Sequence, residues 1–233
     1  MLELKSERLH LLAEAPGQQL AMGGQSLLAD HSGAIYWPAE EVLVVADLRL
    51  DAAAAEPAPR ELLIRLAEVI DRYQPRRVVA LGGASRSAGR EPQIATADLT
   101  RLGILQEDRE WIWLDDRADA EIAARPLGGR VAKALRLAGI SLRHRPAAGS
   151  VAPEIAGSLN PAARLSHYGT SMRRPCFVAN RRRLIMPAFA AVAGGRNVLD
   201  EAFRPLFGND GMAVWLLGQE ALYPVASRLL SGE

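Results

Sequence analysis

Residues 41–50, with the sequence EVLVVADLRL, constrain the fold of this chain more than any other stretch. Five consecutive apolar residues, 42–46, are followed by a lone carboxylate at Asp47. A short apolar run rich in β-branched residues predicts a strand buried on both faces, as in the centre of an α/β sheet. In open α/β sheets the chemistry lies just beyond the carboxyl ends of the strands. Asp47 therefore stands where a functional side chain is expected.

An amphipathic helix and a second buried strand follow the central strand. Apolar residues recur every three or four positions from Glu61 to Tyr73, which predicts a helix that ends before Pro75. The run VVAL at 78–81 then predicts another buried strand. Strand, helix and strand together form a βαβ unit, whose strands are expected to be parallel and whose connection is expected to be right-handed.

The other predicted elements are shorter. They lie at residues 2–12, 23–30, 34–37, 96–106, 111–114, 140–144, 154–159, 175–179 and 183–186. The first of these is a possible edge strand, the next two form a hairpin across the turn at 31–33, and 96–106 is a helix. Parallel strands first and hairpins later predict two sheets packed face to face with helices outside. A chain of 233 residues can bury the core of one such domain.

The composition excludes several classes of protein. The net charge of +1 provides no global positive field, so any contact with nucleic acid must rest on a local patch. Cys176 lies in the strand-like stretch CFVA and is expected to be a buried, inert thiol. A single cysteine excludes an internal disulfide and fits a reducing compartment. Because no stretch approaches membrane-spanning length, we expect a cytoplasmic protein without membrane contact.

Four stretches carry a resemblance to a known family. They read SGAIYWPAEEVLVVADL, RYQPRRVVALG, RRPCFVANRRRLIMPAF and GGRNVLDEAF. With the order of strand ends, they resemble the calcineurin-like metallophosphoesterases, and more narrowly the branch associated with bacterial DNA-repair ligase cassettes. The resemblance implies one domain over residues 1–233, an α/β fold that is a two-sheet α/β/β/α sandwich. It also implies DNA-repair partners such as a ligase, a helicase or a nuclease.

The family's enzymes hold two divalent metals roughly 3.5–4 Å apart, which activate water and neutralise a phosphate oxygen. Compared with the family's motifs, Asp47 matches the first ligand, but Arg49 replaces the histidine that should follow. Gly83 replaces the bridging aspartate, and His144 in LRHRP matches the lone histidine. In the third motif, where the family has Gly-Asn-His-Asp, this chain has Asp116, Arg117, Ala118 and Asp119, so only the aspartate agrees.

The last motif has lost both of its histidines, to Ser158 and Asn160. Asp47 and His144 alone keep the family's ligands, and a cation needs at least three protein donors to compete with water. We therefore expect no catalytic residue, no intact metal site and no cofactor, with Asp47, His144 and Asn160 as remnants. The alternative is an active phosphoesterase or nuclease with weakly bound Mn or Zn in an atypical site.

Three arginines stand at or near the lost ligand positions: Arg49, Arg86 and Arg117. If the fold is kept, they lie at the strand ends, where fixed guanidinium charge could replace metal charge and bind phosphate bidentately. The alternative is that they pair with Asp47, Asp115, Asp116 and Asp119 and fill an inert pocket.

A second basic group flanks the strand at 175–179 and comprises Arg173, Arg174, Arg181, Arg182 and Arg183. These arginines could contact nucleic-acid phosphates. They could equally protect a solvated sheet edge from pairing with another chain.

These observations lead to three hypotheses about function. The first is a catalytically degenerate phosphoesterase-fold protein that binds or assembles with bacterial DNA-repair components. The second is the active enzyme with the atypical site. The third is a structural subunit that pairs through an apolar surface such as the one around Trp215. The predicted fold places Asp47, Gly83, Asp116 and His144 at one common end of the sandwich.

Overall fold

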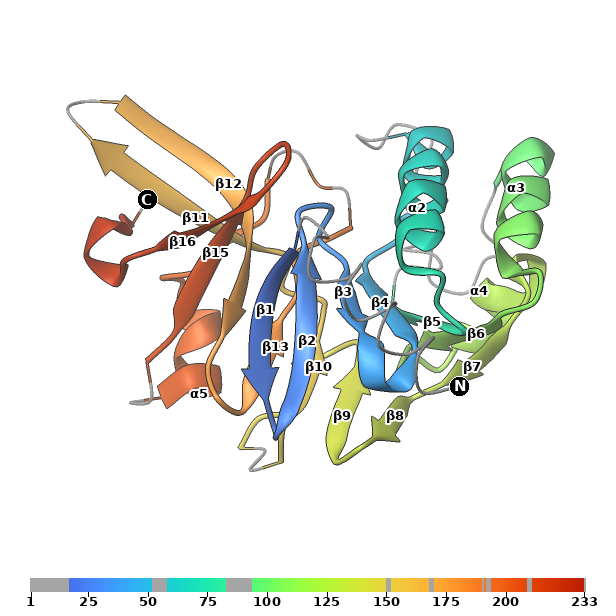
Figure 1. Ribbon diagram of the computed structural model, residues 1–233, viewed down its shortest axis with the longest axis horizontal. Coiled ribbons are helices and arrows are strands. Elements are labelled where there is room, and N and C mark those ends of the chain that lie inside the picture. The colour runs from blue at the N-terminus through green and yellow to red at the C-terminus, as the bar shows by residue number, and fades with distance from the viewer. Residues whose placement is uncertain are drawn as a thin grey trace, which may run out of the picture.

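The computed structural model describes residues 17–51, 58–82, 94–149, 152–167, 170–189, 191, 194–208 and 211–232. The strand predicted at 2–12 and the site positions Gly83 and Arg86 lie outside these residues. Within the described residues the chain forms two β-sheets, with helices α2 and α3 against the first and α5 beside the second (Figure 1).

The first sheet contains seven strands in the described part of the chain, and their spatial order is their order in the sequence. They are β1 (Gly17–Met22), β2 (Gln25–Asp30), β3 (Ile35–Trp37), β4 (Val42–Ala46), β5 (Arg77–Leu81), β6 (Glu110–Leu114) and β7 (Arg130–Ala132). Neighbours from β1 to β4 are antiparallel, and those from β4 to β7 are parallel. Every residue of β4 is buried, which confirms the predicted central strand.

Helices α2 (Pro59–Tyr73) and α3 (Thr96–Gln106) cover the outer face of this sheet (Figure 1). α2 connects the parallel strands β4 and β5, so the predicted βαβ unit is present. Its buried face consists of the periodic apolar positions of the sequence, Leu62, Leu63, Leu66, Val69, Ile70 and Tyr73. The short helix α4 (Ala120–Ala124) follows β6, and the 3-10 turns η1 (Pro38–Glu40) and η2 (Arg125–Leu127) complete this half.

The second sheet is built from the later part of the chain. Its strands run in the order β14 (Arg196–Asn197), β11 (Pro161–His167), β12 (Thr170–Ala179), β13 (Arg183–Ile185), β10 (Glu154–Ala156), β9 (Ile140–Arg143) and β8 (Ala134–Leu137). β15 (Ala213–Leu217) also pairs with β12, and β16 (Leu222–Val225) pairs with β15. β12 begins earlier than predicted, and β10 ends sooner than the predicted strand at 154–159.

An apolar layer joins the inner faces of the two sheets. Trp37, Val44 and Leu81 from the first sheet share one buried cluster with Leu142, Ile155 and Phe177 from the second. The far face of the second sheet is covered by η3 (Glu201–Phe203) and α5 (Arg204–Phe207), which bury Phe203 and Phe207. The layers are therefore α/β/β/α, and the predicted two-sheet sandwich is confirmed.

The packing of the sheets brings one set of strand ends together. β9, β10 and β13 are parallel to one another, as are β4 and β5. A backbone bond connects the two sets where they end, since the Phe189 N–H, in the segment after β13, donates to the Ala46 carbonyl of β4 (2.8 Å). Within the second set, the Met186 N–H donates to the Ala156 carbonyl (2.8 Å). We call this end of the sandwich, which carries Asp47, the Asp47 end.

The opposite end of the second sheet is held by a buried ionic network. Glu154 is fully buried at the start of β10, and its carboxylate lies 3.2 Å from Nε of Arg183 and 3.3 Å from Nε of Arg143. It also accepts two hydrogen bonds from the backbone N–H of Ala147 (3.1 and 3.2 Å). Since the side chain of Arg183 is only 5% exposed, its charge depends on this one carboxylate.

Glu154→Gln should therefore destabilise the fold strongly. Gln keeps the shape of the side chain but leaves the buried Arg183 without a counter-charge, which costs about 3–5 kcal/mol. The free energy of unfolding from urea titration measures the effect.

Glu61→Gln is the matched control, because Glu61 also pairs with an arginine, Arg65 (2.6 Å), but is 53% exposed. We expect it to cost at most about 1 kcal/mol. Equal losses in the two variants would show that burial does not give the Glu154 network its importance.

Candidate functional site

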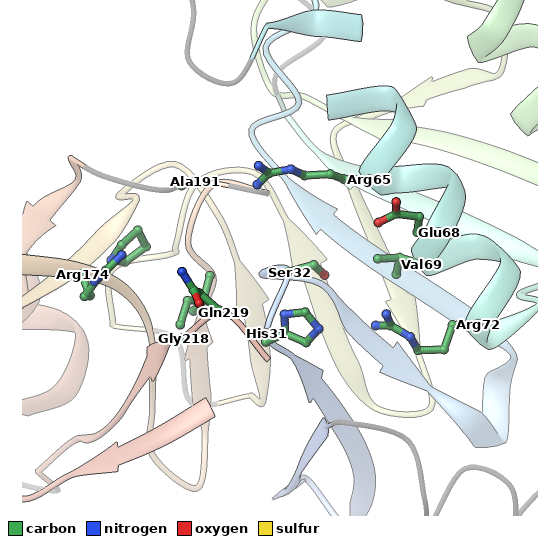
Figure 2. Close-up of a pocket in the computed structure, with 12 residues that line it drawn as sticks. His31, Ser32, Arg65, Glu68, Val69, Arg72, Arg174, Ala191, Gly218 and Gln219 are labelled. Carbon is green, nitrogen blue, oxygen red and sulfur yellow. The ribbon is translucent and has the colours of Figure 1, made fainter. Parts of the chain in front are cut away.

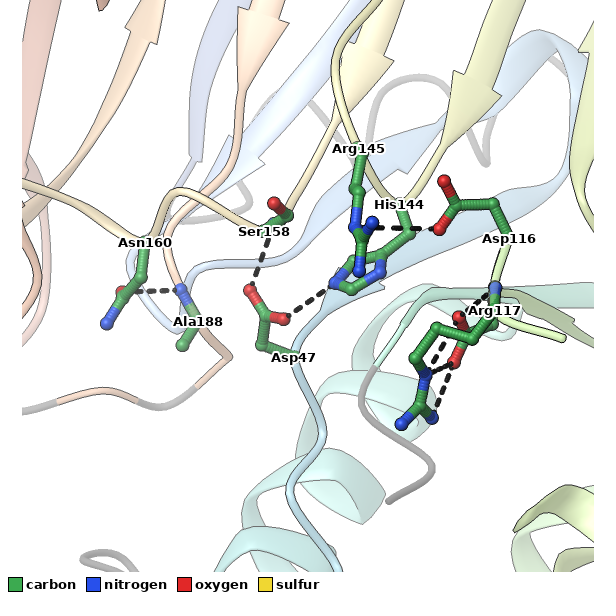
Figure 3. Close-up of polar contacts among 9 residues, drawn as sticks. Asp47, Asp116, Arg117, His144, Arg145, Ser158, Asn160 and Ala188 are labelled. Atoms are coloured by element: carbon green, nitrogen blue, oxygen red, sulfur yellow. Dashed lines mark hydrogen bonds and ion pairs between the residues drawn. The ribbon is translucent and has the colours of Figure 1, made fainter. Parts of the chain in front are cut away.

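Asp47 follows the last residue of β4 and turns the chain sharply away from the sheet. Its φ of 52° lies in the left-handed region, which non-glycine residues rarely adopt. Its N–H donates to the Leu81 carbonyl (3.2 Å), which holds the turn against β5. The carboxylate lies 3.2 Å from Nε2 of His144 through Oδ1, and Oδ2 accepts from the Ser158 N–H at 3.2 Å (Figure 3). Both oxygens of Asp47 are therefore bonded to residues of the second sheet.

His144 follows β9 and packs against the end of β5. It fits only because residue 82 is a glycine, since a Cβ built there would overlap the imidazole ring. Gly82 also has a φ of +71°, which favours glycine. Nδ1 of His144 is buried and has no hydrogen-bond partner among the described residues. The ring is thus fixed by Gly82 on one side and Asp47 on the other.

Ser158 and Asn160 occupy the loop that follows β10. Both have positive φ, 71° and 43°, so the backbone here shares the left-handed geometry of Asp47. The Oδ1 of Asn160 accepts from the Ala188 N–H at 3.0 Å (Figure 3). Asn160 therefore fixes the segment after β13, and this hydrogen bond occupies the side-chain oxygen that could have ligated a metal.

Arg117 is held by the buried Asp115. Its Nε donates at 3.1 and 2.9 Å and its Nη2 at 2.8 Å to the carboxylate (Figure 3). Asp119 lies 4.0 Å from Nε. The hydrogen bonds and charge of Asp115 raise the pKa of Arg117 above its ordinary value, although burial opposes them. Two guanidinium nitrogens of Arg117 are therefore bonded to an internal carboxylate, as in the alternative in which the arginines pair with neighbouring aspartates.

Asp116 lies beside His144 and pairs with Arg145, at 3.6 Å between Nε and Oδ1. One ligand atom each from Asp115, Asp116 and His144 lies within 4.8 Å of the other two. Arg117 and Arg145 compete with any cation for the two carboxylates. Arg145 was missed from the sequence, although its position directly after His144 places it at the same strand end.

The structure brings Asp47, Asp116 and His144 together at the Asp47 end, as the sequence predicted. Of the predicted anion-binding arginines, Arg86 lies outside the described residues. Arg49 lies two residues after Asp47, is half-buried and has no ion pair or hydrogen bond within the described part of the chain.

The second arginine group does not form one patch. Arg173 and Arg174 lie near the start of β12, toward the Asp47 end, whereas Arg181 and Arg182 follow its end. At about 3.3 Å per residue along a strand, the stretch of β12 from Arg174 to its end at Ala179 spans roughly 17 Å. Arg183 is not part of any surface patch, because its side chain is buried against Glu154.

The partner of Arg173 and Arg174 is β11, which the sequence did not predict as a strand. Arg173 lies directly opposite Arg164, and Arg174 opposite Ala163. Arg173 donates to the Gly195 carbonyl, and Arg164 donates to the Ser171 hydroxyl at 2.8 Å. Arg174 is exposed and has no ion pair in the portion of the chain described. This end of the hairpin therefore carries three arginines.

The residues present do not fit a two-metal centre. Asp47 bonds to His144 and Ser158, Asn160 bonds to Ala188, and the sequence has glycine at the bridging position 83. Two metals require several free oxygen or nitrogen donors with open positions for water and substrate. Most of the described donors are instead bonded to one another, to backbone N–H groups or to arginines, and Nδ1 of His144 is the buried exception.

The fold is shared with a solved nuclease. The crystal structure of the Pseudomonas putida nuclease MPE superposes with a TM-score of 0.70 and 23% sequence identity, over 90% of this chain and 100% of that chain. No protein-family model and no curated protein matches the sequence. The likeness shows a shared fold, and it agrees with the two-sheet α/β/β/α sandwich described above. Among the described residues, no helix is long and apolar enough to cross a membrane.

Gly82→Ala should dislodge His144. The added methyl group overlaps the imidazole ring and the residue is strained at positive φ, so we expect a loss of more than about 2 kcal/mol in the free energy of unfolding. Urea titration measures the loss, and the imidazole resonances of His144 should shift.

Gly103→Ala is the control for the substitution itself. Gly103 lies inside α3, and a Cβ there would meet no atom within 4 Å. It should stabilise the protein by about 0.5–1 kcal/mol through helix propensity. Unchanged stability and unchanged His144 resonances in Gly82→Ala would disprove the packing role of Gly82.

Proposed function

We propose that this chain is a non-hydrolytic protein of the metallophosphoesterase fold that binds nucleic-acid phosphates in bacterial DNA repair. The observation that carries the proposal is the contact between Asp47 and His144 at 3.2 Å. These are the two positions that keep the ligands of the family that the chain resembles. Their side chains bond to each other across the two sheets, in the place where each would face a metal.

Charge supports the same proposal. Where an enzyme of this kind concentrates positive metal charge, Arg117 already neutralises Asp115. The exposed Arg174 and the half-buried Arg49 remain to face solvent at the Asp47 end. Arg164 and Arg173 lie directly opposite each other on neighbouring strands, so the hairpin brings two further positive charges close together. A phosphate bound across the hairpin would interact with both.

The biological setting comes from the resemblance and from the nuclease neighbour. The neighbour's name states that it is a nuclease, and the family resemblance points to DNA-repair ligase cassettes. A binding partner of a ligase, helicase or nuclease in the cytoplasm fits a chain that keeps the fold of such an enzyme without its metal ligands.

A second candidate is an active phosphoesterase with an atypical metal site. The cluster of Asp115, Asp116 and His144 is the observation that favours it. Metal binding at this cluster requires Mn or Zn to displace Arg117 from Asp115 and Arg145 from Asp116. Metal analysis of the purified protein separates the candidates, because near-stoichiometric Mn, Fe or Zn that falls in Asp116→Asn would support the enzyme.

We expect no hydrolysis of an aryl phosphodiester or of DNA above background with added manganese. The bridging carboxylate is absent at Gly83, and Asp47 is bonded to His144 and Ser158. Initial-rate assays on wild type and Asp47→Ala decide the point. Turnover that disappears in Asp47→Ala would contradict the proposal, since a contaminating enzyme does not respond to that change.

We expect DNA binding that weakens steeply with salt. Arg49→Gln and Arg174→Gln each remove one guanidinium that would pair with a phosphate. Either substitution should therefore reduce the slope of log K against log salt by about 0.7–0.9. Fluorescence titration with short single- and double-stranded DNA at two salt concentrations measures the slope.

Arg136→Gln is the matched control, because Arg136 is an exposed arginine on β8, at the other edge of the second sheet. It should leave the slope unchanged. Identical slopes in all four proteins, or no binding by wild type, would remove nucleic acid from the function.

A further inference from the structure

A groove of about 510 Å³ lies beside the Asp47 end, between α2 and the second sheet. One part of its lining is the β2–β3 turn, and another is α2 (Figure 2). The third part combines Arg174 of β12 with the turn between β15 and β16 (Figure 2). Arg65 and Arg72 extend from α2 toward His31 and Gln219 (Figure 2). The volume falls within the range of small-molecule sites, about 300–1,000 Å³.

Arg72 is fixed in this groove by a buried carboxylate. Asp30 is fully buried and accepts from Nη1 of Arg72 (2.6 Å), from the Tyr73 hydroxyl (2.7 Å) and from the Ser32 N–H (2.8 Å). Burial alone would raise the pKa of Asp30, but these hydrogen bonds and the charge of Arg72 hold it below its ordinary value. The side chain of Arg72 is still 30% exposed. One side of the guanidinium is therefore anchored, and its remaining N–H donors are oriented in advance.

Two more guanidinium groups line the groove. Arg65 pairs with Glu61 at the surface, a type of ion pair that contributes little and that an anion can displace. Arg174 is exposed on the other wall. Glu68 is the one carboxylate among the described lining residues, and it lies on α2 between Arg65 and Arg72 (Figure 2). The lining therefore holds three guanidinium groups and one carboxylate, and Glu61 and Asp30 pair with Arg65 and Arg72 beside it.

We propose that this groove binds a phosphate group, held by Arg65, Arg72 and Arg174 from opposite walls. Planar guanidinium forks match the oxygens of phosphate and donate charge-assisted hydrogen bonds. His31 and Gln219 add side-chain donors at the floor and rim (Figure 2). The phosphate belongs either to a nucleotide-sized ligand or to a nucleic-acid strand that continues onto the hairpin. The inference shares Arg174 with the proposed nucleic-acid binding, but Arg65 and Arg72 lie outside that proposal and test it independently.

The test is calorimetric titration of the intact chain with inorganic phosphate, a nucleoside 5′-monophosphate and a short oligonucleotide. Arg65→Gln should weaken binding by about tenfold, as expected when one charge-assisted hydrogen bond is removed. Arg72→Lys keeps a positive charge beside Asp30 but removes the paired donors of the guanidinium group. It should therefore weaken phosphate binding with little change in the free energy of unfolding. Glu68→Gln should tighten binding, because it removes the opposing carboxylate.

Arg60→Gln is the matched control, since Arg60 is an exposed arginine of α2 that does not line the groove. Weaker binding of the monophosphate in Arg65→Gln but not in Arg60→Gln identifies a nucleotide-sized ligand. If Arg65→Gln weakens binding of the oligonucleotide, Arg60→Gln does not, and the monophosphate does not bind, the ligand is a phosphate of a nucleic-acid backbone. If no phosphate binds wild type, or if Arg60→Gln weakens binding as much as Arg65→Gln, the inference is overturned. Oligonucleotide binding that depends on Arg49 but not on Arg65 would refute the groove while leaving nucleic-acid binding intact.

Discussion

The apolar layer between the two sheets is the constraint on which the functional end depends. Asp47 and His144 are 97 positions apart in the sequence and belong to different sheets, yet they come within 3.2 Å. No local turn connects them. Their approach follows from burying Trp37 and Val44 of one sheet against Ile155 and Phe177 of the other. A shift of one sheet against the other would disrupt this packing and would also break the contact between Asp47 and His144. The packing of the core therefore determines the geometry at the Asp47 end.

The backbone at the Asp47 end has an unusual conformation in three places. Asp47, Ser158 and Asn160 all adopt positive φ, and none of them is a glycine. Such conformations cost of order 1–3 kcal/mol each and persist only where surrounding contacts enforce them. Here the enforcing contacts are hydrogen bonds: Ser158 N–H to Asp47, and Ala188 N–H to Asn160. The side chains of Asp47 and Asn160 thus stabilise the loops at this end by accepting hydrogen bonds from backbone N–H groups.

The sequence predicted those parts of the fold that have a strong local signal. The buried run at 42–46 and the three- and four-residue spacing of α2 correspond to periodic burial, which a single sequence displays directly. β1 was missed because GQQLAM lacks β-branched residues, and its first three residues are exposed. The common location of Asp47 and His144 followed from strand ends and from the family resemblance. The choice of Asp115 as the partner of Arg117 could not be predicted, since four carboxylates were within plausible reach and only the tertiary structure selects one. The separation between the arginines at the two ends of β12 depends on the length of this strand. The predicted strand at 175–179 was shorter than the observed Thr170–Ala179, so the separation was not predicted.

The placement of charge decides what an arginine-substituted site can still do. At the Asp47 end, Arg117 pairs with the buried Asp115 at 2.8 Å, so the two charges offset each other. The cations that still face solvent lie around it, at Arg49, on the β11–β12 hairpin and along α2. A dication concentrates its field on one oxygen and can polarise it, whereas separated guanidinium groups distribute their charge over several oxygens. That distribution favours holding a phosphate over cleaving it. The proposed binding of phosphate therefore rests on arginines placed around the Asp47 end, and it requires no dication at the centre of that end.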